Sequence, residues 1–157
     1  MASFQVTVKG LDELRAKIKM IGDGMGDILE EAVHSGATVV EKEAKRNSKR
    51  GGAFPHRRTG TLFDSINSVL VSKSKNRVEF AVGSAMVHAR TQELGATITA
   101  KRARFLRFQT PDGKWHRVKT VHIPPRPFLR PALDDNQDKV EAEIQKRLML
   151  LIGRHAK

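Results

Sequence analysis

The chain has 157 residues, of which 39% are hydrophobic and 29% are charged, a balance that indicates one folded domain and excludes a chain disordered throughout. It contains no cysteine, which excludes disulfide bonds, thiolate metal ligands and thiol nucleophiles, and its formal net charge is +12. We expect neither a signal peptide nor a membrane span, because the N-terminus lacks a basic start and no apolar run approaches the roughly 20 residues that a span requires.

The first predicted elements are a strand and a helix. Phe4, Val6 and Val8 alternate with polar residues, which predicts a half-buried strand over 3–9. Apolar residues at helical spacing then predict a helix over 11–21, and the glycines that follow end it.

A second helix is predicted over 27–47, with Asp27 as its N-cap and Glu30 as the capping partner. One face of this helix is apolar and is expected to pack against another element. Its residues are Leu29, Val33, Gly36, Ala37, Val40 and Ala44. Gly36 and Ala37 are small enough to permit the close approach of a second backbone.

A basic loop without apolar periodicity is predicted over 48–60, and loops of this length tend to be functional. Two strands over 65–72 and 77–82 follow as a hairpin. A short helix over 87–94 is expected to end at Gly95.

A second, strongly basic hairpin is predicted from strands over 105–109 and 115–123. The Asp112-Gly113 pair between them favours a tight turn. The aromatic residues of this hairpin, Phe105, Phe108 and Trp115, interleave with arginines. We interpret it as an amphipathic hairpin with its aromatic side chains turned to the core; the alternative is a surface for nucleic acid.

The last predicted elements are an extended segment, caused by Pro124, Pro125 and Pro127, and a long helix over 130–152 with Pro131 in its first turn. The helix has an apolar stripe formed by Leu129, Leu133, Val140, Ile144, Leu148 and Leu151. Its end is apolar on every side, because Met149, Leu150 and Ile152 fall outside this stripe. A helix end of this kind is typical of a surface that packs against another protein in addition to its own core.

Together these elements predict one α+β domain over 1–157. We expect an antiparallel sheet with long helices packed on one face and a long C-terminal helix. The domain carries a basic loop at 48–60 and a basic hairpin at 101–123.

The positive charge is confined to two segments. Residues 42–58 and 101–119 hold 14 of the 29 basic residues and 2 of the 17 acidic residues, so the rest of the chain is neutral. This distribution predicts contact with nucleic acid or with an acidic partner; the alternative is two solvated basic loops. The candidate DNA- or partner-facing residues are Lys49, Arg50, Arg57, Arg58, Arg102, Arg104, Arg107, Lys114 and Arg117.

Motifs for catalysis and metal binding are absent. The sequence has no nucleophile elbow, phosphate loop or His-Glu-x-x-His pair, and its six histidines are scattered. Pro111-Asp112-Gly113-Lys114 matches part of a nuclease motif, but the second acidic element of such a site is missing, and a turn explains the residues. Glu93 is expected to be a cap or an ion-pair partner rather than a general base. We therefore expect no enzyme, no metal and no cofactor.

Signatures of sequence-specific nucleic-acid-binding domains are absent as well, since the sequence has no helix-turn-helix, zinc-finger or RNA-recognition motif. Any contact with DNA is then expected to involve phosphates and to be independent of sequence.

Five separated segments follow one another in an order that resembles the neck or tail-completion family of siphophages. They are Val-Lys-Gly-Leu-Asp-Glu-Leu at 8–14, Arg-Thr-Gly-Thr-Leu-Phe-Asp-Ser-Ile at 58–66, Val-Gly at 82–83, His-Ala-Arg-Thr-Gln-Glu-Leu-Gly at 88–95 and Arg-Pro-Phe-Leu-Arg-Pro-Ala-Leu at 126–133. The resemblance covers nearly the whole chain. It departs from the family at His88, where tyrosine is common, and the hairpin at 101–119 is variable in such proteins.

The resemblance implies a non-catalytic structural protein of the virion, assembled in the bacterial cytoplasm, that joins head and tail. It implies a homo-oligomer that forms a hexameric ring around the DNA channel. Its neighbours would be head-closure, tail-terminator or tail-tube proteins. The ring would contact double-stranded DNA non-specifically and would not bind a membrane. A ring requires two unlike surfaces that meet head to tail. We expect the inter-subunit contacts to include Arg126, Pro127, Phe128, Met149, Leu150 and Ile152.

Two functions of other classes remain open. One is a sequence-independent nucleic-acid-binding accessory protein that acts alone, for which salt-sensitive DNA binding by a monomer would be the sign. The other is a small nuclease or hydrolase, for which the sign would be metal-dependent activity.

Overall fold

The body of the molecule is organised around α2 (Met25–Asn47), in a computed structural model that describes residues 4–5, 25–55, 59–110 and 112–155. The predicted helix over 27–47 is confirmed, although it begins at Met25, so Asp27 lies within the first turn and is not the N-cap. Its carboxylate instead accepts a hydrogen bond from Lys73 Nζ at 2.5 Å. The predicted helix over 11–21 and most of the predicted strand over 3–9 lie outside the described residues.

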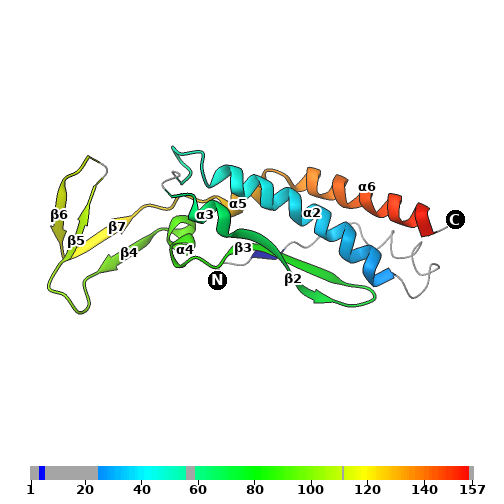
Figure 1. Ribbon diagram of the computed structural model, residues 1–157, viewed down its shortest axis with the longest axis horizontal. Helices are drawn as coiled ribbons and strands as arrows, with labels where there is room; N and C mark the ends of the chain where they lie inside the picture. Colours follow the sequence, from blue (N-terminus) through cyan, green and yellow to red (C-terminus); the bar gives the residue numbers. More distant parts are fainter. Residues whose placement is uncertain (1–3, 6–24, 56–58, 111, 156–157) are drawn as a thin grey trace.

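α6 (Gln137–His155) runs antiparallel to α2 along its length (Figure 1). The predicted stripe of α6 is buried through Val140, Ile144, Leu148 and Leu151. The two helices approach closely at Gly36, where a Cβ atom would lie only 2.6 Å from Ile144 Cγ1. The small residue that the sequence places on this face of α2 is therefore required by the packing.

The predicted helix over 130–152 is two helices, α5 (Leu129–Asp134) and α6, and the single helix was wrong. Asn136 separates them, because its side-chain amide donates to the Ala132 carbonyl at 3.1 Å while its own carbonyl accepts from the Val140 amide at 2.9 Å. The chain thus ends one helix and begins the next within two residues.

A three-stranded antiparallel sheet of order β1–β3–β2 covers another side of α2 (Figure 1). Its strands are β1 (Phe4–Gln5), β2 (Ile66–Lys73) and β3 (Val78–Ser84), so the predicted hairpin is confirmed. Ile66, Phe80 and Val82 from this sheet are buried with the apolar faces of α2, α5 and α6 in one core.

Two short helices connect the body to the rest of the chain. Residues 48–55 contain neither a helix nor a strand, as predicted, but the sequence analysis missed α3 (Thr61–Ser65) directly after the loop. α4 (Val87–Leu94) has the predicted bounds and ends at Gly95, which has a φ of 70°. A side chain at this position would be strained and would collide with the Ile123 carbonyl, 2.8 Å from the Cβ position.

Residues 96–123 form an arm that extends from α4 to one end of the molecule, away from α2 and α6 (Figure 1). It consists of two two-stranded antiparallel ladders, β4 (Ala96–Thr99) with β7 (Thr120–Ile123) and β5 (Leu106–Gln109) with β6 (Trp115–Val118). The predicted turn between the last two is confirmed: the Gly113 amide donates to the Thr110 carbonyl at 2.9 Å.

Two predictions about the arm were wrong. The expected strand over 115–123 divides at Lys119, because residues before it pair with β5 and residues after it pair with β4, a strand that the sequence analysis missed. The aromatic side chains of the hairpin do not turn to the core, since no residue of the arm belongs to the buried cluster. The fold class is confirmed as mixed α+β with antiparallel sheets and a long C-terminal helix.

Candidate interaction surfaces

The hairpin of β5 and β6 presents arginines and aromatic rings on one face. Arg107 and Arg117 are directly opposite each other in the strand register, and Gln109 faces Trp115. The Arg107 guanidinium lies over the Trp115 ring, 4.7 Å from Cζ to the ring centroid, and Arg117 lies over Phe105 at 4.2 Å. We call Phe105, Arg107, Trp115 and Arg117 the arginine–aromatic face.

This face is open to solvent within the subunit. Trp115 is 61% exposed, and both arginines are exposed. Among the residues that the structure describes, neither Arg107 nor Arg117 forms an ion pair with a carboxylate. Stacking on a ring holds each guanidinium in place while its N–H groups remain able to bind an acidic group.

Other basic residues surround the arginine–aromatic face. Arg102, Arg104 and Lys114 are exposed, as are Lys101 and Lys119 at the base of the hairpin. The Asp112 carboxylate lies 3.7 Å from Lys114 Nζ, and a hydrogen bond from Thr110 helps to hold the pKa of Asp112 below its ordinary value. The outer part of the arm is therefore a strongly cationic surface.

The base of the arm is fixed to the body by Glu93. This buried carboxylate, 4% exposed, accepts hydrogen bonds from the amides of Phe128 at 2.8 Å, Leu129 at 3.0 Å and Arg130 at 2.9 Å. The Arg126 amide also donates to the Gln92 carbonyl at 2.6 Å. The predicted role of Glu93 as a cap is confirmed, but only the structure reveals that it joins the two ends of the arm.

A second basic surface lies at the C-terminal end of α2. Arg46, Lys49 and Arg50, with Glu43, line a pocket of about 600 Å³. Lys49 Nζ lies 5.0 Å from the Phe63 ring centroid, and Arg50 Cζ lies 5.1 Å from that of Phe54. We call Arg46, Lys49 and Arg50 the helix-end patch. The candidates Arg57 and Arg58 lie outside the described residues.

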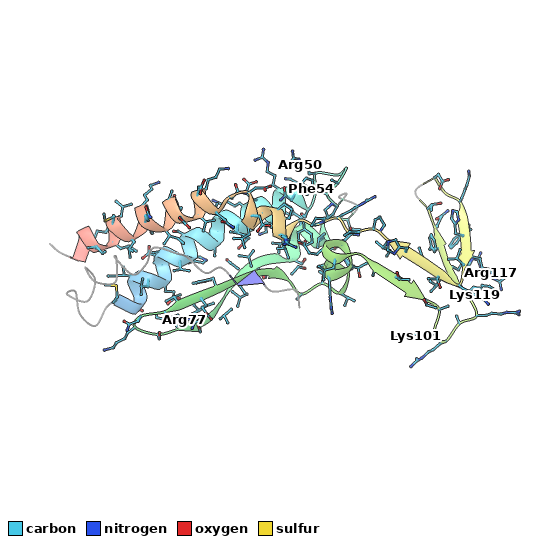
Figure 2. All side chains as sticks on the ribbon, turned by 180° about the vertical axis from the view of Figure 1, so that it is seen from behind. Arg50, Phe54, Arg77, Lys101, Arg117 and Lys119 are labelled. Atoms are coloured by element: carbon cyan, nitrogen blue, oxygen red, sulfur yellow. The ribbon has the colours of Figure 1, made fainter. Side chains whose placement is uncertain are left out.

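The two basic surfaces are separate. Figure 2 shows Arg50 and Phe54 beside the helices, whereas Lys101, Arg117 and Lys119 lie at the end of the arm. The structure therefore does not bring all the basic candidates together. It divides them into one group on the body and one group on the arm.

The C-terminal tip of α6 is apolar and lies at the opposite end of the molecule from the arm (Figure 1). Met149 is 67% exposed and Leu150 is 50% exposed, whereas Ile152 packs partly against the core. Phe128 is wholly buried, so its side chain belongs to the core and not to a contact surface, contrary to the sequence analysis. Arg126 and Pro127 are half-buried beside it.

No cluster of side chains in the described part of the chain fits a metal ion, because no three His, Asp or Glu groups lie close enough together there. The described helices also include none that is long and apolar enough to cross a membrane. Glu93, the carboxylate considered as a general base, is occupied by three backbone amides.

Comparison with models of known protein families gives a match. The model of a family described as "Bacteriophage HK97-gp10, putative tail-component" matches residues 12–95, which include the basic loop, β2, β3 and α4. Neither a curated protein nor a solved structure matches the chain. The arm and the C-terminal helices lie beyond the matched residues.

Proposed function

The chain belongs to the HK97-gp10-like family of bacteriophage tail components, and we propose that it is a single-domain structural protein of the head–tail connection that forms a ring around the DNA channel. In this role it joins head and tail, contacts the head-closure, tail-terminator or tail-tube proteins, and catalyses no reaction. It acts within the virion, after assembly in the host cytoplasm.

One observation carries this proposal: the elongated subunit has two unlike, uncovered surfaces at opposite ends. The arm is basic and aromatic, and the tip of α6 is apolar through Met149 and Leu150. Subunits of a ring meet through unlike surfaces related by a rotation that closes. An exposed apolar tip and an arm without a core of its own are both expected where neighbouring proteins supply the missing contacts.

The helix-end patch supports contact between the ring and DNA. Three cations gather around one pocket, and two of them, Lys49 and Arg50, are held beside aromatic rings. Such a group attracts phosphates of any sequence and releases counterions when it binds them. Any contact with DNA that passes through a channel has to be independent of the DNA sequence, as phosphate contacts are.

The test is to remove the protein from the phage. Without it, filled heads and finished tails should accumulate separately, and addition of the purified protein should join them and restore infectivity. Particles that remain complete and infectious without the protein would contradict the proposal.

The alternative of a nucleic-acid-binding accessory protein that acts alone is favoured by positive charge, which is concentrated in the helix-end patch and on the arm. It requires that the monomer bind DNA tightly and with strong salt dependence, and that particles assemble without it. No arrangement of side chains in the described residues favours the alternative of a nuclease.

A further inference from the structure

The arginine–aromatic face carries an unresolved charge conflict. Arg107 and Arg117 are directly opposite each other on a two-stranded ladder, and like charges at such positions destabilise the pairing. A lone two-stranded hairpin is marginally stable in water, and this one does not pack against the helical core. An acidic group placed between the two guanidinium groups would relieve the repulsion and hold the hairpin.

The complementary charge lies on the same chain, at the start of α6. Most acidic residues in the described part of the chain have an assigned partner: Lys73 binds Asp27 and Glu30, Arg147 binds Glu31, and Glu93 binds backbone amides. Asp135, Asp138 and Glu141 form no ion pair there. Asp138 and Glu141 are three residues apart on α6, and Asp135 lies in the turn just before it; we call these three residues the acidic corner.

We propose that the arginine–aromatic face of one subunit docks against the acidic corner of a second copy of this chain. The inference rests on the proposed function, since it names the contact that links neighbouring subunits of the ring. Each guanidinium is planar, is positioned by a ring, and can bind a carboxylate through two parallel hydrogen bonds. Trp115 would be covered by the neighbour and would provide the apolar centre of the interface.

A second copy fits this face better than DNA. Phosphates would satisfy the arginines but would leave Trp115, 61% exposed, without a partner. Tryptophan and arginine together at an exposed site are typical of protein interfaces. The arm extends to one end of the molecule, whereas α6 starts on the body, so the two surfaces are unlike and spatially separate, as a head-to-tail contact requires (Figure 1).

Trp115 gives a direct measurement of this docking, because the chain has one tryptophan and no tyrosine. Assembly of the full chain at low salt should move the Trp115 emission to shorter wavelength and reduce its quenching by acrylamide. Sedimentation of the same samples reports self-association independently. Self-association without any change in Trp115 emission would overturn the docking of the arm while leaving the ring intact.

Charge reversal then identifies the partner. Arg107→Glu with Arg117→Glu, or Asp135→Lys with Asp138→Lys, should each weaken self-association by at least about tenfold. The variant with all four changes should recover it. An equimolar mixture of the two double variants offers two complementary contacts, the Arg arm against the Asp corner and the Glu arm against the Lys corner, so it should recover self-association with the two variants alternating.

The matched control is Lys42→Glu with Arg90→Glu, which makes the same change of net charge at two exposed sites outside both surfaces. It should self-associate as the unmodified chain does. Equal loss of self-association in the control and in the arm variant would overturn the specific contact.

A shift of the Trp115 emission that appears only when duplex DNA is added would identify DNA as the occupant of this face instead. A chain that stays monomeric at every concentration would contradict the ring itself.

Discussion

Gly36 of α2 lies against Ile144 of α6 so closely that a Cβ atom on the glycine would be 2.6 Å from Ile144 Cγ1 and 3.2 Å from Val140 Cγ1. Because both atoms belong to buried side chains, neither can move without disturbing the core. The pairing of the two long helices therefore depends on this one missing side chain.

Gly36→Ala should lower the free energy of unfolding by roughly 1–2 kcal/mol, since overpacking costs more than the gain in helix propensity. Urea denaturation measures this change. Gly26→Ala is the matched control in the same helix, because its Cβ would meet Lys73 Cε at an ordinary 3.6 Å. If Gly36→Ala has the same free energy of unfolding as the control, α2 and α6 do not pack as closely at Gly36 as the structure shows.

Glu93→Gln should loosen the base of the arm. An amide cannot accept from Phe128, Leu129 and Arg130 as the two carboxylate oxygens do, so we expect a loss of about 1–3 kcal/mol. Hydrogen exchange of the amides at 128–130 should become faster. Glu143→Gln, at a half-buried site on α6 beside Lys146, serves as the control and should leave that exchange unchanged.

The pH dependence of stability should include a contribution from Glu41. Partial burial raises its pKa, but hydrogen bonds from Lys45 and Ser68 outweigh this effect and leave the pKa below the ordinary value of 4.5. A lowered pKa in the folded state means that the stabilisation is complete above about pH 4.5 and is lost as the pH falls below it. Glu41→Gln should flatten the fall of the urea midpoint in this range. An unchanged slope would show that Glu41 titrates alike in the folded and unfolded chains.

Changing Met149 and Leu150 to glutamine should prevent assembly without unfolding the subunit. Both side chains are exposed, and burying each at an interface is worth about 1.5–3 kcal/mol. Ile152 is left unchanged because it packs partly against the core. Leu148→Gln, at a wholly buried neighbour, should instead unfold the chain. Thermal melting separates the two effects, and a double variant that melts early would place the tip in the subunit core.

The sequence predicted those parts of the fold in which periodicity is long and local. α2 and the hairpin of β2 and β3 follow directly from their apolar spacing. β4 was missed because Ala-Thr-Ile-Thr is too short to establish a period, and its partner β7 lies beyond an intervening hairpin. The break between α5 and α6 depends on the side chain of Asn136, which apolar spacing does not register.

The candidate sites were predicted by residue type but not by location. Charge counting identified both basic segments, yet only the fold separates the helix-end patch from the arm. The role of Glu93 requires amides 35 to 37 residues away in the chain, which no local pattern reveals. Likewise, Phe128 was expected at an inter-subunit contact because it lies in the proline-rich extended segment, whereas its ring fills the core.

Electron microscopy of the whole particle can show whether this protein forms a ring at the head–tail connection. With the chain tagged and the neck of purified particles imaged, we expect the label in a closed ring of identical subunits around the DNA channel, with each arm against the adjacent subunit. Label found elsewhere in the particle, or single unassembled copies at the neck, would contradict the proposed ring.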